Sequence, residues 1–487
     1  MRDNKLLTLL VFLLIGLFAV SGCDFTEPAA LQDDETSLGE MRGPEYVEGE
    51  LLVSIQEDRE LTTYTAENQK SMIINEAEEH AEIMEEAGFE AESLFRRDEN
   101  KLQISADLAS RVAEEVGHIN VVEFDTDRYK DLEKAKNGLA EILDSANIKY
   151  NFISPNYIIE KMETSGELVS QSTGAHMHPK QEWHYEHVSA PEAWEVEEGY
   201  EDVRIAILDT GIDYNHESLE DYVDVNLSED FTDEGIGDRD GHGTHVAGTV
   251  ASYNEVSGVM REATLIDVSV LDDMGAGELD WTISGILHAI DIDSDIMNMS
   301  LGEDIPIGDP LLDEMDEVLE IAMDEGTLPI AAAGNIGAPI RDPDFGRVTY
   351  PAGSPHTIAV GATDENKDRA GFSNYGDELD VMAPGANIFS TLSDSHSYEE
   401  NDLEIEEING YKYAFMPGTS MSAPHVAGAA GLLRAVEPDI STSDMETILK
   451  EAAEDIGASE YYGYGMIDAY KGISYGILDP VLPLSER

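Results

Sequence analysis

Three segments of the chain each place one reactive side chain among small residues, a setting in which a substrate can approach closely. The reactive residues are Asp209 in Ile207–Gly211, His242 in Gly241–Gly248 and Ser420 in Gly418–Gly428. Attack on a peptide carbonyl needs a hydroxyl made nucleophilic by a base, and a carboxylate that orients this base and stabilises its charged form. The three side chains therefore predict nucleophilic catalysis through a covalent intermediate.

The order of these residues along the chain separates the site from two other classes of serine hydrolase. Chymotrypsin-like enzymes have the order His, Asp, Ser and α/β-hydrolases the order Ser, Asp, His, whereas this chain has Asp, His, Ser. Ser420 also lies in Gly-Thr-Ser-Met-Ser and not in a Gly-x-Ser-x-Gly elbow. The sequence therefore argues against a lipase or an esterase.

The three motifs and their order resemble those of the subtilisin-like serine peptidases. The resemblance implies that Asp209 is the orienting carboxylate, His242 the general base and then acid, and Ser420 the nucleophile. His245 and His425 belong to the same motifs. We expect packing roles for both, because His242 and Ser420 already match the catalytic positions.

A developing oxyanion needs hydrogen-bond donors aimed at it, and Ala331–Asn335 resembles the family's donor segment. The resemblance implies that the Asn335 side chain supplies one N–H. The backbone N–H of Ser420, at a helix N-terminus, would supply the other. An Asn after Gly is also common in turns, so a turn role for Asn335 stays open.

The segment Asn298–Gly302 resembles the family's substrate-binding edge, where an extended peptide pairs with backbone groups as an added strand. The residues expected to line the site are Ser300, Leu301, Gly302, Ala333 and Gly334. Their apolar character predicts cleavage after large hydrophobic residues, and backbone pairing implies broad specificity. Tyr350–Pro351 resembles a neighbouring family element that is often a cis peptide, and an ordinary trans turn stays open.

Apolar strands alternate with amphipathic helices over residues 181–475, the range that the resemblance covers. The expected buried strands are Val203–Asp209, Ala263–Leu271, Asp295–Leu301, Leu328–Gly334 and His356–Ala362. A helix is expected over Pro310–Glu325, with one apolar and one acidic face. This alternation predicts an α/β fold with a mostly parallel sheet flanked by helices, the three-layer sandwich of subtilisin-like enzymes.

Residues 45–163 predict a small α+β domain with the order β-α-β-β-α-β, a ferredoxin-like pattern. The expected elements are strand 49–55, helix 73–87, strands 102–104 and 121–124, helix 132–143 and strand 150–159. The opening Gly49–Val53 and the close Ser154–Tyr157 resemble the family's inhibitory propeptide, which is removed by self-cleavage. We expect processing in the connector 164–180. A permanent interaction module is the alternative.

Residues 1–22 have the form of a signal peptide, with an apolar run too short for a comfortable membrane span. Cys23, the only cysteine, ends the sequence Val-Ser-Gly-Cys, which resembles a bacterial lipoprotein box. We expect a lipid on this residue, and a plain secretory signal is the alternative. Residues 23–44 predict a polar linker and residues 476–487 a C-terminal tail.

Acidic residues dominate the composition, with 103 Asp and Glu against 28 Lys and Arg and a net charge of -75. This balance argues against binding to nucleic acid, and against a membrane contact other than the lipid on Cys23. The acidic residues interleave with apolar ones, unlike those of a disordered acidic tail. Since concentrated salt screens charge repulsion, we expect a protein adapted to high salt.

No cofactor is expected for catalysis, and structural Ca²⁺ is the one metal that the resemblance suggests. The loop Asn254–Val259 resembles the family's tight calcium loop in length, and the candidate ligands are Asn254, Glu255 and Val259. Ser218 stands where the family commonly has a ligating Asp, which leaves the site open. The acidic run over 230–240 is expected to be solvated surface, and cation binding there is the alternative. No His-Glu-x-x-His zinc motif occurs.

Together these features predict an exported serine endopeptidase made as a self-processed zymogen. Its partners would be protein or peptide substrates and its own propeptide. The lipid on Cys23 would hold the precursor at the cell envelope, and the mature enzyme would be released. A catalytically inactive binding protein with the same fold is the alternative, and the intact triad with Asn335 argues against it.

Overall fold

The computed structural model describes residues 44–56, 80–94 except 82, 86 and 87, 104–162 except 127 and 130, 177–396 except 233, and 403–478. Several predicted features lie outside these residues. They are the signal peptide, Cys23, nearly all of the linker 23–44, most of helix 73–87, most of the connector 164–180 and most of the tail 476–487. None of the described helices is long and apolar enough to cross a membrane.

The centre of the C-terminal region, residues 177–478, is a seven-stranded sheet with the order β15-β14-β11-β9-β5-β7-β6. Every neighbouring pair in it is parallel. The strands are β5 (Gly199–Asp209), β6 (Glu229–Asp230), β7 (Glu262–Ser269), β9 (Ile296–Met299), β11 (Leu328–Ala332), β14 (Ile358–Thr363) and β15 (Val381–Pro384). Strands buried on both faces are apolar along their length, which explains the continuous apolar runs in the sequence.

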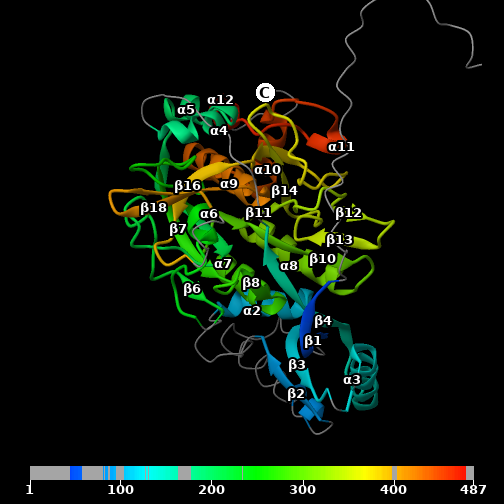
Figure 1. Cartoon of the computed structure of the whole chain (residues 1–487). Helices are drawn as coiled ribbons and strands as arrows, with labels where there is room; N and C mark the ends of the chain where they lie inside the picture. The colour runs from blue at the N-terminus through cyan, green and yellow to red at the C-terminus, as the bar shows by residue number, and fades with distance from the viewer. Residues whose placement is uncertain are drawn as a thin grey trace, which may run out of the picture. The chain divides into compact units, whose positions relative to one another are not determined.

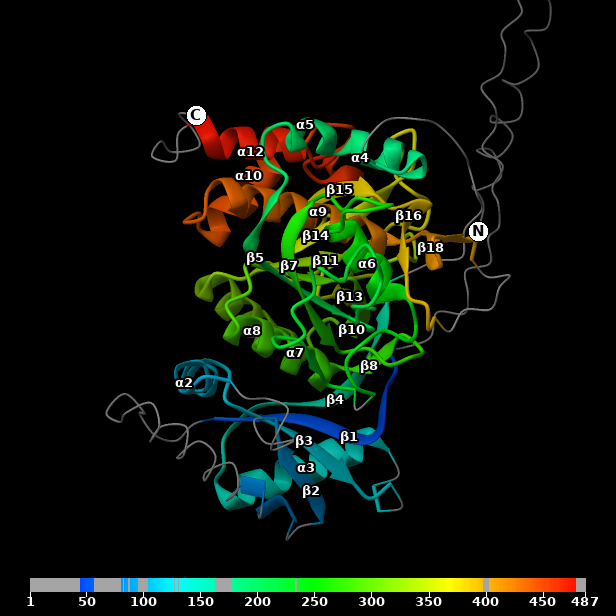
Figure 2. The ribbon, with the colours of Figure 1, turned by 90° about the vertical axis from the view of Figure 1, so that its left-hand side faces the viewer.

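Helices cover both faces of this sheet, and successive residues of β5 show the division. Ile205 and Ile207 lie in one apolar cluster with α6 and α9, whereas Ala206 and Leu208 lie in another with α7 and α8. The four helices are α6 (His242–Val250), α7 (Leu279–Asp291), α8 (Leu311–Glu325) and α9 (Thr419–Val436). Figures 1 and 2 show α9 on one side of the strands and α7 and α8 on the other. The predicted three-layer α/β fold is confirmed.

Shorter elements complete the described part of the C-terminal region. They are η2 (Pro179–Gln181), α4 (Glu182–His187), α5 (Ala190–Trp194), β8 (Ala276–Glu278), β10 (Leu301–Pro306), β12 (Arg341–Asp342), β13 (Arg347–Tyr350), β16 (Ile388–Leu392), β17 (Ile405–Ile408), β18 (Tyr411–Met416), α10 (Thr442–Ala452), α11 (Ser459–Tyr462) and α12 (Ala469–Leu478). The Tyr350–Pro351 peptide is cis.

The N-terminal region, residues 44–162, contains an antiparallel sheet with the order β4-β1-β3-β2. Its elements are β1 (Tyr46–Ile55), β2 (Phe89–Ser93), α2 (Ala106–Glu115), β3 (His118–Phe124), α3 (Leu132–Ala146) and β4 (Tyr150–Lys161). Leu51 and Val53 of β1 pack with Leu139 and Leu143 of α3. Alternate residues of β1 therefore face this helix, as the period of a strand requires.

The predicted strand over 102–104 lies, except for its last residue, outside the described residues. Among the described elements β2 is the second strand, and helix α2 follows it. In β2 only the end residues Phe89 and Ser93 are buried, so its apolar signal is weak. Buried residues recur in steps of four from Leu108 to Val116, a helical spacing. The Ser105 hydroxyl caps α2 by accepting from the Leu108 N–H at 3.2 Å.

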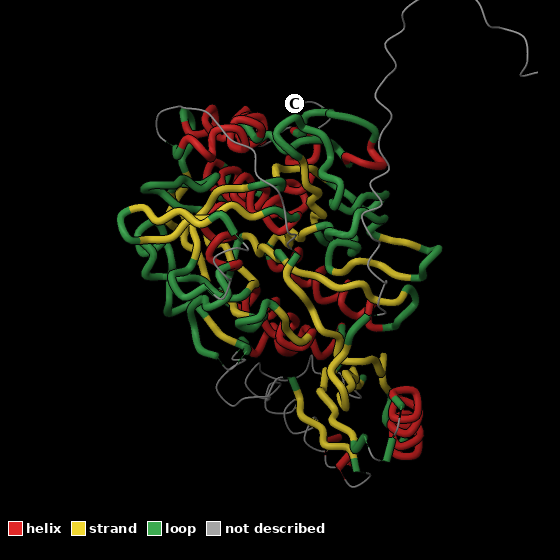
Figure 3. The backbone as a smooth tube through the Cα atoms, viewed as in Figure 1, coloured by secondary structure: helices red, strands yellow, loops and turns green. Residues whose placement is uncertain are grey.

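Strand β4 connects the two regions because its last residues pair with strands of the C-terminal region. Residues 158–160 pair antiparallel with β8, and residues 160–161 pair antiparallel with β10. The N-terminal sheet is therefore continuous with edge strands of the C-terminal region, in the order β12-β13-β10-β4-β1-β3-β2. These strands are drawn in yellow in Figure 3.

Candidate active site

The three predicted catalytic residues lie at the carboxyl edge of the parallel sheet. Asp209 is the last residue of β5, His242 the first residue of α6 and Ser420 the second residue of α9. All three are buried, with 0% exposure. In open parallel sheets this edge is where loops and helix starts converge on a ligand.

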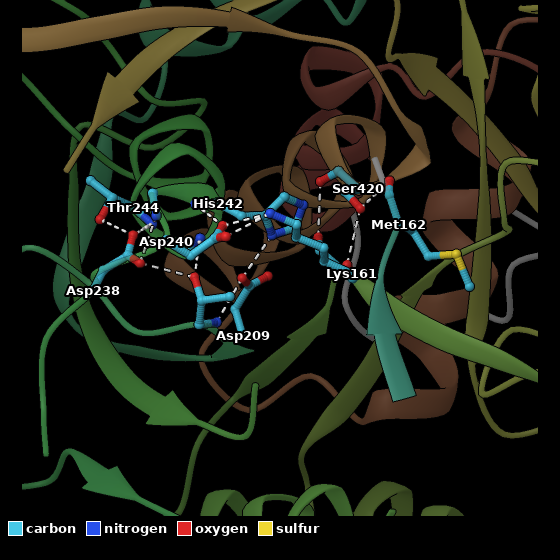
Figure 4. Close-up of polar contacts among 12 residues, drawn as sticks. Lys161, Met162, Asp209, Asp238, Asp240, His242, Thr244 and Ser420 are labelled. Atoms are coloured by element: carbon cyan, nitrogen blue, oxygen red, sulfur yellow. Dashed lines mark hydrogen bonds and ion pairs between the residues drawn. The ribbon is translucent and has the colours of Figure 1, made fainter. Parts of the chain in front are cut away.

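The His242 imidazole is oriented by the Asp209 carboxylate. The distance from Nδ1 of His242 to Oδ1 of Asp209 is 2.7 Å. A carboxylate only accepts hydrogen bonds, so Nδ1 carries the hydrogen and Nε2 is the basic nitrogen. The Thr210 backbone N–H holds Asp209 Oδ1 at 2.8 Å. In Figure 4 His242 lies between Asp209 and Ser420.

The Ser420 side chain lies against the end of β4. Its hydroxyl contacts the carbonyl oxygen of Met162 and donates to the carbonyl oxygen of Ser300 at 3.0 Å. The backbone N–H of Ser420 also donates to the Met162 carbonyl, at 3.1 Å. The Met162 carbonyl oxygen therefore accepts from a backbone N–H at a helix start, as an oxyanion would, and lies against the Ser420 hydroxyl (Figure 4).

The Asn335 side-chain amide is fixed by the residue before Ser420. Its Oδ1 accepts from the backbone N–H of Thr419 at 2.9 Å and from the Thr419 hydroxyl at 3.0 Å. These donors set the orientation of the amide, because Nδ2 could not accept from them. Nδ2 of Asn335 is buried and has no hydrogen-bond partner among the described residues. A buried, oriented donor is therefore available beside the helix start that carries Ser420.

Backbone pairing holds the end of β4 in this site. The Met162 N–H donates to the Ser300 carbonyl at 3.1 Å, and the Lys161 N–H donates to the Gly275 carbonyl at 3.0 Å. The Met162 side chain lies against Gly302, where an added Cβ would stand 2.8 Å from Met162 Cε. The site therefore accommodates an extended chain with an apolar side chain at the serine.

The predicted substrate-binding residues divide into two groups. Those that pair with or bond to the end of β4 are Ser300, Leu301 and Gly302. Ala333 instead donates its N–H to the Val360 carbonyl at 2.9 Å. Gly334 donates to the Thr419 hydroxyl at 3.1 Å. Ala333 and Gly334 thus join the Asn335 loop to the sheet and to the start of α9.

Three acids of the run over 230–240 are not solvated surface, contrary to the prediction, whereas Glu234 is exposed as predicted. Asp230, Asp238 and Asp240 are only 7%, 4% and 2% exposed. Asp238 accepts from the backbone N–H groups of Gly241 and Thr244, at 2.8 and 2.9 Å. Burial raises the pKa of Asp238 to about 7. Composition alone missed this burial because the donors that satisfy the carboxylates come from the fold of the loop.

In the candidate calcium loop, hydrogen-bond donors approach two of the three predicted ligands, and the Ca²⁺ site stays a prediction. The Val259 carbonyl accepts from the Trp194 indole N–H at 2.8 Å. The Glu255 carboxylate accepts from the Asn409 amide at 2.8 Å, and the Asn254 amide donates to the Glu217 carbonyl at 3.5 Å. Among the described residues no group of three or more His, Cys, Asp or Glu side chains could hold a metal ion.

The other two histidines of the predicted catalytic motifs are buried and bond to backbone carbonyls, not to the Ser420 hydroxyl. Nε2 of His245 bonds to the Ile388 carbonyl at 3.0 Å, and Nδ1 of His425 bonds to the Met421 carbonyl at 2.8 Å. Burial lowers the pKa of His245 to about 3 and that of His425 to about 4. Both rings are neutral near pH 7 and act in packing.

The fold and this arrangement of side chains are those of the subtilisin-like class of proteins. Residues 201–465 match the model of the subtilase family, and the chain belongs to that family. Thermophilic serine proteinase from Bacillus sp. (strain AK1) is 31% identical over 387 residues, which cover 77% of this chain and 86% of that protein. Subtilisin Savinase from Lederbergia lenta is 36% identical over 292 residues, 59% of this chain and 96% of that protein.

Subtilisin NAT from Bacillus subtilis subsp. natto is 40% identical over 269 residues, 55% of this chain. The chain covers 64% of the length of that relative. A crystal structure of a lanthipeptide protease aligns with a TM-score of 0.51 at 24% identity, over 61% of this chain and 94% of that one. This last similarity supports the fold alone.

Proposed function

We propose that this protein is a serine endopeptidase, exported and made as a zymogen, with Asp209, His242 and Ser420 as its catalytic triad. The observation that carries the proposal is the Met162 carbonyl, which meets both the hydroxyl and the backbone N–H of Ser420. A peptide carbonyl from the chain itself is thus held where a substrate carbonyl would be attacked. Membership of the subtilase family supports the same reaction.

In the proposed reaction the Ser420 hydroxyl turns from the Ser300 carbonyl toward His242. Nε2 of His242 takes the proton while Ser420 Oγ bonds to the substrate carbonyl carbon. The Asp209 carboxylate stabilises the resulting imidazolium through the 2.7 Å hydrogen bond. The carbonyl oxygen becomes an oxyanion, which accepts from the Ser420 N–H and from Nδ2 of Asn335.

Collapse of this intermediate breaks the peptide C–N bond, and His242 gives its proton to the leaving amine. The acyl group remains as an ester on Ser420. A water molecule, deprotonated by His242, then attacks the ester, releases the new carboxyl end and restores the serine. Water is the only co-reactant that the sequence of steps consumes.

We propose the bond between Met162 and Glu163 as the site of self-cleavage. The connector 164–180, where processing was predicted, begins one residue beyond this bond. Hydrolysis there would separate the N-terminal region from the C-terminal region. Because β4 is held by backbone pairing on both sides, the cleaved region would stay bound as an inhibitor until it is displaced.

The same contacts support extended peptides with apolar residues as substrates. Met162 lies on Gly302, and Ile159, three residues earlier, is 1% exposed. Backbone pairing carries most of the binding, so a broad range of protein substrates is expected. The preference for a hydrophobic residue at the cleaved position follows from the Met162 contact.

We further propose that the lipid on Cys23 anchors the precursor and that self-cleavage releases the C-terminal region. The lipidation candidate precedes the inhibitory region in the chain. Two or three acyl chains on one cysteine would hold the precursor firmly. Fractionated cells should hold a Ser420→Ala precursor in the membrane fraction and the wild-type C-terminal region in the medium. A C-terminal region that stays with membranes after high-salt and mild-denaturant washes contradicts release.

The test of the activity uses purified protein at molar salt with an unfolded protein substrate and a serine-directed fluorophosphonate. We expect labelling of Ser420, loss of proteolysis on labelling, and a new N-terminus at Glu163 in mass spectra. Labelling confined to other residues, together with an intact precursor, would instead favour the inactive binding protein. A new N-terminus within 165–180 alone would move the processing site and leave the activity standing.

A further inference from the structure

The residue before Met162 makes a buried ion pair with the C-terminal region. Nζ of Lys161 lies 2.8 and 2.7 Å from the two carboxylate oxygens of Asp240. The two side chains are only 12% and 2% exposed. Figure 4 shows the lysine side chain directed from β4 to Asp240, next to the triad. This pair is no part of the proposed catalytic steps.

The Asp240 carboxylate is held in place by the start of the catalytic helix. Its Oδ1 also accepts from the backbone N–H of His242 at 3.1 Å. Because Asp240 precedes His242 by two positions, this hydrogen bond fixes its carboxylate relative to the imidazole. The basic side chain that reaches it here comes from the residue immediately before the one whose carbonyl contacts Ser420.

Gly275 lies against the methylene groups of the Lys161 side chain. A Cβ on Gly275 would stand 2.5 Å from both Cδ and Cε of Lys161, so a larger residue would obstruct the methylene chain. Gly275 also has a positive φ of +75°, which disfavours other residues there. The Gly275 carbonyl accepts from the Lys161 N–H at 3.0 Å, which fixes the backbone beside this wall.

The space between Gly275 and Asp240 favours a positively charged side chain. A buried carboxylate is costly unless it is paired, so an apolar or acidic side chain in the same place would leave Asp240 without its cation. A lysine offers an apolar stem to Gly275 and an ammonium to Asp240. The chain itself has only 28 Lys and Arg among 487 residues. A requirement for a basic residue would therefore leave few sites at which the enzyme could cleave its own chain.

We propose that Asp240 and Gly275 form a specificity pocket for a basic side chain at the residue immediately before the one whose carbonyl is attacked. The proposal deepens the proposed endopeptidase function and rests on it. The preferred substrates are extended peptides in which lysine or arginine precedes a large apolar residue. Lys161 and Met162 form such a pair at the proposed site of self-cleavage.

The test uses the self-processed enzyme and quenched fluorescent peptides of the sequence Ile-Ile-Glu-X-Met-Glu-Thr, in which X is lysine, norleucine or glutamate. We expect kcat/KM for the lysine peptide to exceed that for norleucine by at least about tenfold. Asp240→Asn should bring this ratio close to one, and Asp240→Lys should place glutamate above lysine. Asp273→Asn removes one negative charge from an exposed residue of the neighbouring turn and should leave the ratio unchanged.

Equal rates for the three peptides with the wild-type enzyme would overturn the pocket and leave the endopeptidase standing. Failure to cleave any peptide, with no fluorophosphonate on Ser420, would overturn both proposals. A second measurement avoids variants of the catalytic region. Self-processing should slow at least about tenfold in Lys161→Gln and be largely retained in Lys161→Arg. Equal processing of these two precursors would also overturn the pocket.

Discussion

The N-terminal and C-terminal regions differ in how much of their apolar surface each covers by itself. In the C-terminal region, helices of the same region cover both faces of the parallel sheet. In the N-terminal region α3 covers one face, while Leu52 and Phe152 on the other share an apolar cluster with Leu311 and Met315 of α8. The C-terminal region completes its own core, and the N-terminal region is completed by docking.

Three side-chain contacts between the two regions pair a donor of one region with a carboxylate of the other. The Tyr157 hydroxyl and the Ser154 hydroxyl both donate to Asp309 at 2.9 Å, and the Asn156 amide donates to Asp280 at 2.9 Å. The N-terminal region supplies donors and the C-terminal region supplies carboxylates. The chain has a net charge of -75. Docking therefore gives hydrogen-bond donors to carboxylates that would otherwise face one another or solvent.

The strongest test of this comparison removes the proposed nucleophile, Ser420, so that the two regions should stay in one chain. Ser420→Ala should abolish processing and lower turnover of added substrate by about 10⁶-fold, a magnitude measured in subtilisin itself. Gel electrophoresis and peptide hydrolysis report the two effects. Ser422→Ala is the matched control, because the Ser422 hydroxyl is buried without a partner among the described residues. A mature fragment in the Ser420→Ala sample would mean that another protease cuts the chain.

Removal of the proposed oxyanion donor tests the C-terminal region alone. Asn335→Ala should lower kcat by about 10²- to 10³-fold with little change in KM, again a size known from subtilisin. The melting temperature should be measured alongside, because Oδ1 of Asn335 also accepts from Thr419. A higher KM at unchanged kcat would assign Asn335 to the ordinary turn role.

Salt should raise the stability of the whole precursor but weaken the ion pairs between its two regions. Screening of carboxylate repulsion should raise the melting temperature of the Ser420→Ala precursor by more than about 5 °C between low and molar salt. The same screening weakens exposed ion pairs between the regions. Calorimetry over a salt series reports the first effect, and a flat or falling melting temperature would remove the proposed adaptation to high salt.

Acid should destabilise the C-terminal region through its buried histidines. Burial lowers the pKa of His425 to about 4, below the value near 6.5 of an unfolded chain. The stability from its neutral ring is complete above pH 6.5 and is lost as the pH falls toward 4. Asp238 and Asp267, whose pKa values burial raises to about 7, act with the opposite sign, so a variant is needed to isolate the histidine.

His425→Gln in the Ser420→Ala background provides this isolation. At pH 7 the substitution should lower the free energy of unfolding. This difference between the two proteins should become smaller by about 3 kcal/mol as the pH falls from 6.5 to 4. The reason is that Nε2 of His425 accepts from Nδ1 of His184 at 2.9 Å, and protonation removes that acceptor. Denaturant unfolding at several pH values measures the difference, and a constant offset would contradict the assignment.

The smallest expected effect concerns the ion pairs between the regions. Arg111 of α2 lies 2.7 Å from Asp324 and 2.6 Å from Glu325, and these acids are largely exposed. Arg111→Gln should weaken docking by about 1 kcal/mol, so that activity appears up to about fivefold faster after self-cleavage at low salt. Lys134→Gln, which breaks an exposed pair within α3's first turn, is the control. Equal rates would mean that the Arg111 ion pairs add nothing to docking.

The order of the catalytic motifs and the parallel sheet could be predicted because their signals are local. Apolar runs predict doubly covered strands, and Asp209, His242 and Ser420 stand at a strand end and two helix starts that small residues mark. The same local logic failed at β2, where a short strand with alternating acids carries little apolar signal. It failed again at Asp238 and Asp240, which have the composition of surface but are buried.

By itself, the sequence determined the family, the α/β fold and the side chains available for catalysis, since each depends on residues close together in the chain. Tertiary structure alone decided which carbonyl lies at the nucleophile and which acid pairs with Lys161. The first contact joins Met162 to Ser420 across 258 positions, and the second joins Lys161 to Asp240 across 79. No periodicity or motif encodes such pairs, because they form only when β4 enters between β8 and β10.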